Sequence, residues 1–270
     1  MRMSSKLSSL AWSKFNLNLM ACGDYDGVML QIDAETGHWI VEADEHDGRR
    51  IWSTRFSPLI AGLAATAGDS GTVKLWMGTT SDRPVMALAP HASCPVTCVD
   101  FSPDDPARIA ASSVDGRVYV YDLRAAAAPL YVLAGGGDTR PSSYVRWNGQ
   151  DKLVSSSTDN AVREWALPRG GAAGPPRRGH HVDPPPVGSL SWEAPGRTAQ
   201  RQVRFCPLKV GPSHVHVGHT NARRFVGLGI SPSGLIATGD EAGGLFCYHS
   251  SAQGPVAVLP GSGAGDFPTS

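Results

Sequence analysis

Side chains that could carry nucleophilic or acid–base chemistry occur in this sequence, but they follow a structural repeat. Ser70 follows Asp69 in a Gly-Asp-Ser-Gly string, and a serine nucleophile would need a histidine base that a carboxylate orients. Asp69 has counterparts in Asp115 and Asp159, which stand at the same position of successive repeat units. Because Asp is favoured in tight turns, where it bonds its own backbone, these carboxylates are expected to be structural. We therefore predict that the chain is not an enzyme.

The histidines and cysteines do not form a metal-ligand pattern. The five cysteines are an odd number and include no Cys-x-x-Cys pair, which argues against both a disulfide framework and a zinc site. His46, His91 and His219 fall near the connections between repeat units, where we expect them to bond neighbouring units. We predict no metal and no cofactor.

The repeat unit is clearest in Ile109–Arg124, IAASSVDGRVYVYDLR. A run of small residues is followed by Asp115-Gly116, a turn signal because Gly tolerates a positive φ. The segment after the turn alternates valine with tyrosine, as a β-strand does. The unit therefore predicts a strand, a tight turn and a second strand.

The unit recurs along the chain, and its spacing predicts the architecture. Its apolar anchors are separated by 44, 45, 44 and 83 residues. These anchors are Ile32, Trp76, Tyr121, Trp165 and Tyr248. A period near 44 is typical of WD-type propeller blades, each a four-stranded sheet. We predict an all-β fold, a β-propeller of WD repeats with five recognisable blades that either closes as five or is part of a larger ring.

The repeat divides the chain into four segments. Residues 1–167 hold the first four visible blades, residues 168–217 form a Pro/Arg-rich insertion, residues 218–260 are the fifth blade, and residues 261–270 are a flexible tail. The insertion contains nine of the 21 prolines, so we expect a disordered surface loop. Two alternatives remain open: a retained intron translated through, or a degenerate blade with GSLSW and RQVRF as strands.

Composition limits the classes of partner. Lys and Arg total 24, as do Asp and Glu, so the formal net charge is zero. That balance argues against nucleic acid or an anionic membrane as the dominant partner. No apolar run approaches the ~18 residues of a membrane span, and the first residues lack the apolar core of a signal peptide. We expect a protein of the nucleus and cytoplasm whose partners are other proteins.

Several strings go beyond a generic repeat: GDYDGV, DEHDGRRIWS, VYVYDLR, SSSTDNAVREW and GHTNARRFVGL. Together they resemble the repressor of UV-B photomorphogenesis proteins, close relatives of the constitutively photomorphogenic E3 ligase and the suppressor-of-phytochrome propellers. The resemblance implies a seven-bladed ring in which another blade precedes the KLS string. It also implies a negative regulator of light signalling that binds the UV-B photoreceptor, the photomorphogenic ligase or Val-Pro-containing transcription factors.

The resemblance assigns a peptide-binding surface. The positions that match the Val-Pro pocket of the ligase family are Lys6, Tyr25, Arg50, Trp52, Arg140 and Phe225. Aromatic walls suit a Val-Pro pair, and the cations could meet carboxylates that flank it. The alternative interpretation is that Trp52 packs between blades, that Phe225 is a core residue, and that Lys6 and Arg50 are solvated charges at the rim.

Ile109–Arg124 also resembles the 16-residue box of WD repeats that bind the cullin-4 adaptor. The resemblance implies that Asp122 and Arg124 contact that adaptor, so the alternative function is a substrate receptor or propeller fragment of a cullin-4 or photomorphogenic E3 ubiquitin ligase. The other interpretation is structural, because a blade needs every mark of the box except Arg124 for its own fold.

Overall fold

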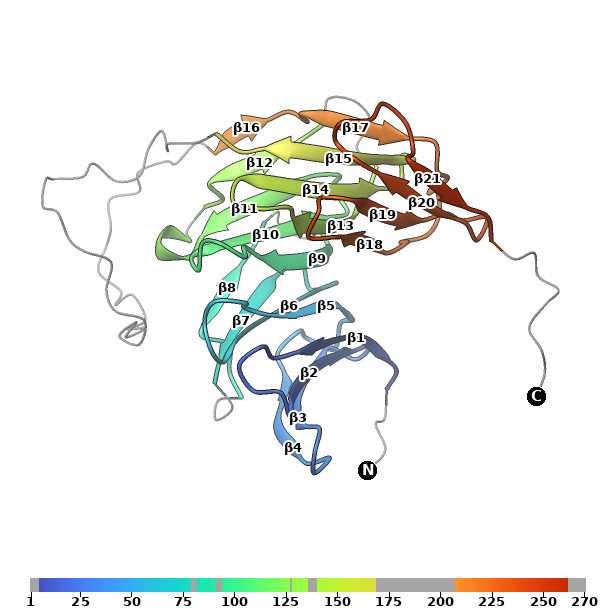
Figure 1. Ribbon diagram of the computed structural model, residues 1–270. Helices are drawn as coiled ribbons and strands as arrows, with labels where there is room; N and C mark the ends of the chain where they lie inside the picture. The colour runs from blue at the N-terminus through green and yellow to red at the C-terminus, as the bar shows by residue number, and fades with distance from the viewer. Residues whose placement is uncertain are drawn as a thin grey trace, which may run out of the picture. The chain divides into compact units, whose positions relative to one another are not determined.

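Five sheets account for the described part of the chain. The computed structural model describes residues 5–78, 82–90, 94–126, 128–135, 140–168 and 207–261. The sheets follow one another along the chain, and within each the strands pair in chain order, as Figure 1 shows. The predicted all-β fold of WD-repeat propeller blades is confirmed.

The first two sheets have four strands each. The first contains β1 (Leu7–Trp12), β2 (Leu19–Asp24), β3 (Val28–Asp33) and β4 (Trp39–Asp44). The second contains β5 (Ile51–Phe56), β6 (Leu63–Gly68), β7 (Val73–Met77) and β8 (Met86–Leu88).

The third sheet has five strands and the last two have four each. The third contains β9 (Val96–Phe101), β10 (Arg108–Ser113), β11 (Val118–Asp122), β12 (Tyr131–Leu133) and β16 (Leu208–Val210), with the 3-10 helix η1 (Leu123–Ala125) after β11. The fourth contains β13 (Ser142–Trp147), β14 (Lys152–Ser157), β15 (Ala161–Ala166) and β17 (His214–Val217). The fifth contains β18 (Leu228–Ile230), β19 (Ile236–Gly239), β20 (Leu245–Tyr248) and β21 (Ala257–Leu259).

Two strands lie inside the region predicted as an insertion at residues 168–217. β17 is the outer strand of the fourth sheet and pairs antiparallel with β15. β16 pairs parallel with β12 and adds a fifth strand to the third sheet. Regular β-structure therefore resumes before residue 218. The sequence pattern did not predict these two strands, because both are short and are held by backbone pairing. The prediction of disorder for residues 169–206, like that for the tail beyond residue 261, lies outside the described residues.

Neighbouring sheets pack through their inner strands. β1 lies against β5, β5 against β9, β9 against β13, and β13 against β18. The second strand of each blade is rich in Ala, Ser and Gly, which lets the next sheet approach closely: a Cβ at Gly23 would lie 2.4 Å from Ile51 Cγ2. Fully buried Leu63, Leu75 and Ile109 fill the space between the second and third sheets. Burying each such side chain contributes about 1.5–3 kcal/mol.

The predicted role of the inter-blade histidines is confirmed at His46 and His219. His46 follows β4, and its Nε2 lies 2.8 Å from Thr66 Oγ1, which also accepts a hydrogen bond from Trp76 Nε1 at 2.9 Å. His219 follows β17, and its Nδ1 lies 3.0 Å from Tyr248 Oη. Each histidine thus ties a connection to the next blade, while His91 lies outside the described residues. Across the described part of the chain, no helix is long and apolar enough to cross a membrane.

The buried histidine makes stability depend on pH. Burial, helped by the charge of Lys74, lowers the pKa of His46 from 6.5 to about 4. The unfolded chain therefore binds a proton that the folded chain excludes between these values, and the free energy of unfolding falls as pH drops through this interval. We expect the loss to approach about 3 kcal/mol for this group, measured by denaturant unfolding.

His46→Gln is the matched variant, because glutamine keeps hydrogen-bonding groups but does not titrate. Its unfolding free energy should vary less steeply with pH than that of the parent, with a residual slope from His219, whose pKa burial also lowers. Equal slopes in the two proteins would contradict the assignment.

Candidate functional site

The guanidinium group of Arg50 lies between two aromatic rings. Its Cζ is 4.0 Å from the centroid of the Tyr25 ring and 4.5 Å from that of the Trp52 ring. Both distances are within the range of cation–π attraction, which contributes about 0.5–2 kcal/mol for each ring. Its Nε is buried and has no hydrogen-bond partner among the described residues.

Tight turns place these side chains together. Asp24 Oδ1 accepts hydrogen bonds from the backbone N–H groups of Asp26 and Val28, which leaves Tyr25 at the tip of the β2–β3 turn. On the neighbouring blade, Asp69 N donates to Arg50 O at 2.8 Å. A Cβ at Gly68 would lie 2.1 Å from that oxygen, so glycine is required for this approach.

The indole of Trp52 is held from two sides. Its Nε1 donates to Asp69 Oδ1 at 2.6 Å. Its ring meets the ring of Phe225 edge to face, with centroids 5.7 Å apart and an interplanar angle of 71°. Asp69 is a site residue that sequence reasoning assigned only to turn formation, because an aspartate recurs at that position in other blades.

The structure brings together four of the six residues predicted for peptide binding, Tyr25, Arg50, Trp52 and Phe225. Lys6 lies next to Tyr25, whose backbone N–H donates to the Lys6 carbonyl oxygen at 3.0 Å. The Lys6 residue is exposed. Arg140 is also exposed, and its carbonyl oxygen accepts a hydrogen bond from Ser157 Oγ. No contact of Arg140 with the aromatic cluster is seen within the described residues.

This aromatic–arginine cluster, defined as Tyr25, Arg50, Trp52 and Phe225, has the chemistry of a peptide-recognition surface. Rigid rings offer apolar contact area at small entropic cost. Arg50 supplies a planar guanidinium cation that can donate several hydrogen bonds in its plane. The alternative that Trp52 packs between blades fits its contact with Phe225, which precedes β18, and both side chains are only partly buried.

Ser70 and His46 lie close together but are not arranged for catalysis. Ser70 Oγ is 2.8 Å from His46 Nδ1, and the other ring nitrogen bonds Thr66. His46 is completely buried, and its pKa of about 4 makes it a weak base near neutral pH. In the part of the chain that the structure describes, no three His, Cys, Asp or Glu side chains gather to hold a metal ion.

Asp122 and Arg124, the residues of the predicted adaptor contact, form an ion pair with each other. Arg124 Nε and Nη2 donate to the two carboxylate oxygens of Asp122 at 2.8 and 2.6 Å. Burial raises the pKa of Asp122, but hydrogen bonds from Arg124 outweigh it, so the carboxyl pKa is lowered overall. The Arg124 side chain remains 69% exposed, so the ion pair presents a fixed guanidinium to solvent.

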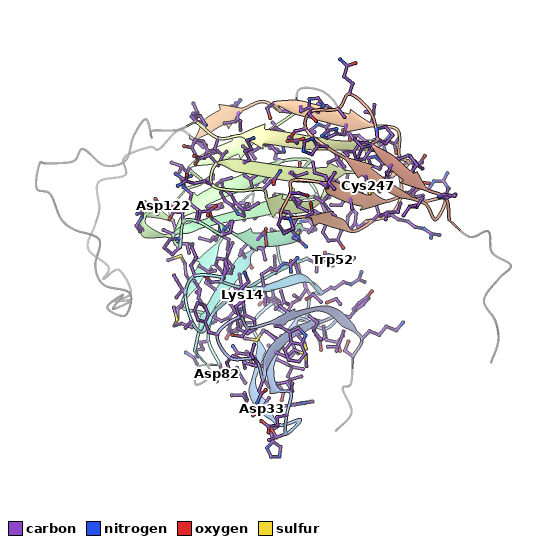
Figure 2. The ribbon with its side chains drawn as sticks, viewed as in Figure 1. Lys14, Asp33, Trp52, Asp82, Asp122 and Cys247 are labelled. Carbon is purple, nitrogen blue, oxygen red and sulfur yellow. The ribbon has the colours of Figure 1, made fainter. Side chains whose placement is uncertain are left out.

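The aromatic–arginine cluster and the Asp122–Arg124 pair lie on opposite faces of the blades. Tyr25 stands in a turn between the second and third strands of its blade, whereas Asp122 ends the third strand of another. Because all blades are built alike, such turns lie on one face and the ends of third strands on the other. Figure 2 shows Trp52 and Asp122 on opposite sides of the sheets.

Comparison with known proteins agrees with this architecture. The family model "WD domain, G-beta repeat" matches residues 82–122. Protein SPA1-RELATED 3 of Arabidopsis thaliana is 34% identical over 252 residues, which cover 93% of this chain and 25% of that protein. WD repeat-containing protein RUP1 of the same plant is 30% identical over 257 residues, covering 94% of this chain and 56% of RUP1.

The E3 ubiquitin-protein ligase COP1 of Arabidopsis thaliana is 29% identical over 252 residues, covering 93% of this chain and 30% of the ligase. The chain therefore spans no more than 56% of any of these three relatives. The sheets and the family-model match show WD-repeat propeller blades, and the relatives show that this chain is similar to the RUP, SPA and COP1 proteins.

Proposed function

We propose that this chain is a non-enzymatic interaction protein that acts as a negative regulator of UV-B and light signalling. Its partners in this proposal are the UV-B photoreceptor and related proteins that contain a Val-Pro pair, and its place of action is the nucleus and cytoplasm. The observation that carries the proposal is the aromatic–arginine cluster, in which Arg50 stacks between Tyr25 and Trp52.

The cluster suits a Val-Pro segment flanked by acidic residues. Trp52 and Phe225 meet edge to face and leave apolar surface on which a valine and a proline ring could pack. A carboxylate beside that pair could accept from the guanidinium group of Arg50, a residue that is only partly buried. Lys6, next to Tyr25, adds a second cation at the same face.

The relatives support a role in light signalling. RUP1 and RUP2 of Arabidopsis thaliana are each 30% identical to this chain, and strings such as GDYDGV and DEHDGRRIWS resemble those of the UV-B repressors. Since no catalytic arrangement is needed for such a role, the function proposed rests on binding alone.

The cluster is tested by binding a blocked Val-Pro peptide with flanking glutamates. Trp52→Ala removes the central wall and should weaken binding by about 1 kcal/mol or more, a Kd increase of about fivefold or greater by calorimetry. Asp69→Ala frees the indole and should also weaken binding. Asp69→Asn keeps an oxygen acceptor for Trp52 Nε1 and should bind nearly as well as the parent.

Phe15→Ala is the matched control, because Phe15 is an exposed aromatic residue after β1, at the opposite face. Its affinity should equal that of the parent. Equal affinities for the parent, Trp52→Ala and Asp69→Ala would remove the cluster as the binding site.

A second candidate function is that of a substrate receptor or propeller fragment of a cullin-4 or photomorphogenic E3 ubiquitin ligase. The observation that favours it is the Asp122–Arg124 ion pair, which holds an exposed guanidinium in a fixed position after β11. Such a group could donate to a carboxylate or carbonyl of a ligase adaptor. The similarity to COP1, an E3 ubiquitin-protein ligase by name, agrees with this assignment.

Arg124→Ala tests the second candidate, because the residue is exposed and its loss leaves the blade's own packing in place. If the chain binds the cullin-4 adaptor through this face, capture of the adaptor in a pull-down should fall by about tenfold, as for loss of a well-placed interface arginine. Arg163→Ala, which removes a guanidinium paired with Asp159 at a β14–β15 turn, is the control on the other face. Unchanged capture by Arg124→Ala would leave the box with a structural role only.

A further inference from the structure

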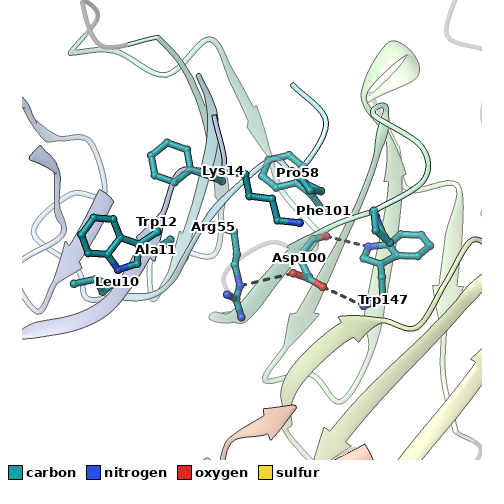
Figure 3. Close-up of a pocket in the computed structure, with 11 residues that line it drawn as sticks. Leu10, Ala11, Trp12, Lys14, Arg55, Pro58, Asp100, Phe101 and Trp147 are labelled. Atoms are coloured by element: carbon teal, nitrogen blue, oxygen red, sulfur yellow. Dashed lines mark hydrogen bonds and ion pairs between the residues drawn. The ribbon is translucent and has the colours of Figure 1, made fainter. Parts of the chain in front are cut away.

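A cavity opens at the face opposite the aromatic–arginine cluster, where the inner strands end. Its volume is about 400 Å³. It is lined by Trp12 at the end of β1, Phe56 at the end of β5, Phe101 at the end of β9 and Trp147 at the end of β13. Figure 3 shows these walls with the charged side chains among them.

One carboxylate is fixed at the base of this cavity. Asp100 Oδ2 accepts from Trp147 N at 3.0 Å, and Trp147 Nε1 donates to the Asp100 carbonyl oxygen at 3.1 Å. Arg55 Nε lies 3.7 Å from the other carboxylate oxygen. The Asp100 side chain is only 18% exposed, so these contacts lock it in place.

Positive charge exceeds negative charge around Asp100. The cations that act on it are Arg146, Arg55 and Lys14. Lys14 is exposed and forms no salt bridge with a described residue, and Figure 3 shows its ammonium pointing toward Asp100. Burial raises the pKa of Asp100 and outweighs the three cations.

The wall that β1 provides remains accessible to a ligand, whereas Phe101 and Trp147 are buried. Trp12 is 53% exposed and Leu10 is 47% exposed, although both lie on the strand that lines the cavity. The exposed Trp12 ring beside the unpaired Lys14 favours a ligand that has both a carboxylate and an apolar side chain. A cavity of about 400 Å³ holds a few side chains rather than a domain.

We propose that this cavity is a second peptide-binding site, which takes an extended acidic segment of a partner protein. A carboxylate of the segment accepts from Lys14 and Arg55, while a neighbouring apolar side chain packs against Trp12 and Phe56. The occupant is a peptide rather than a nucleic acid, because the chain has no net positive charge to hold a phosphate backbone. The site is independent of the aromatic–arginine cluster, so one chain could hold two partners.

The test uses the full chain and a blocked peptide, Gly-Asp-Leu-Asp-Pro-Gly, in calorimetry. Lys14→Gln removes one unpaired cation from an exposed position and should weaken binding by about tenfold, the effect of losing a charge-assisted hydrogen bond. Lys209→Gln is the matched control, because Lys209 is exposed on β16 at the outer edge of the third sheet. It should bind like the parent, and so should Trp52→Ala, which alters only the other face.

The peptide with both aspartates replaced by asparagine should bind at least about tenfold more weakly than the acidic one. The proposal would be overturned if the acidic peptide did not bind at a concentration of about 1 mM, where a Kd of that size corresponds to a binding free energy of about 4 kcal/mol. Equal affinities for the acidic and the asparagine peptide would also overturn it. So would equal affinities of Lys14→Gln and the parent for the acidic peptide. Concentration-dependent dimerisation that Lys14→Gln abolishes would identify a second copy as the occupant instead, and competition by an oligonucleotide would identify a nucleic acid.

Discussion

The stacking of Arg50 between Tyr25 and Trp52 is the interaction on which the candidate binding face depends. The three residues come from two neighbouring blades, so the stack exists only if the first and second sheets approach closely. That approach in turn requires glycine where a strand meets the next blade, as at Gly23, while Gly68 lets the Arg50 carbonyl approach within the second blade. Backbone packing thus decides where the cation stands, and Asp69 and Phe225 fix the indole beside it.

The repeat made the blades predictable from sequence. The outer edge strands of the third and fourth sheets could not be predicted in this way. Trp76 and Trp165 stand at one position of the third strand, and each donates to a Thr or Ser of the second strand, so chemistry and spacing agree there. β16 and β17 carry no such mark. Their placement depends on pairing with strands already formed, which a local pattern does not encode.

The candidate site was predictable only in its residue types. Resemblance to a family pointed to the aromatic and basic residues, and four of them do come together. It did not reveal that Asp69 holds Trp52, because the same aspartate serves turns elsewhere. Nor did it indicate the cavity around Asp100, whose walls come from the ends of separate inner strands and converge only in the folded chain.

The most direct measurement follows the indole N–H signals of the seven tryptophans by NMR during titration with a Val-Pro peptide. The Trp52 signal, assigned by its absence in Trp52→Phe, should shift in a saturable way because its ring forms the wall of the cluster. The signals of Trp76 and Trp165, both buried within blades, should stay in place. Saturable binding that leaves the Trp52 signal unmoved would contradict the assignment of the binding face to the aromatic–arginine cluster.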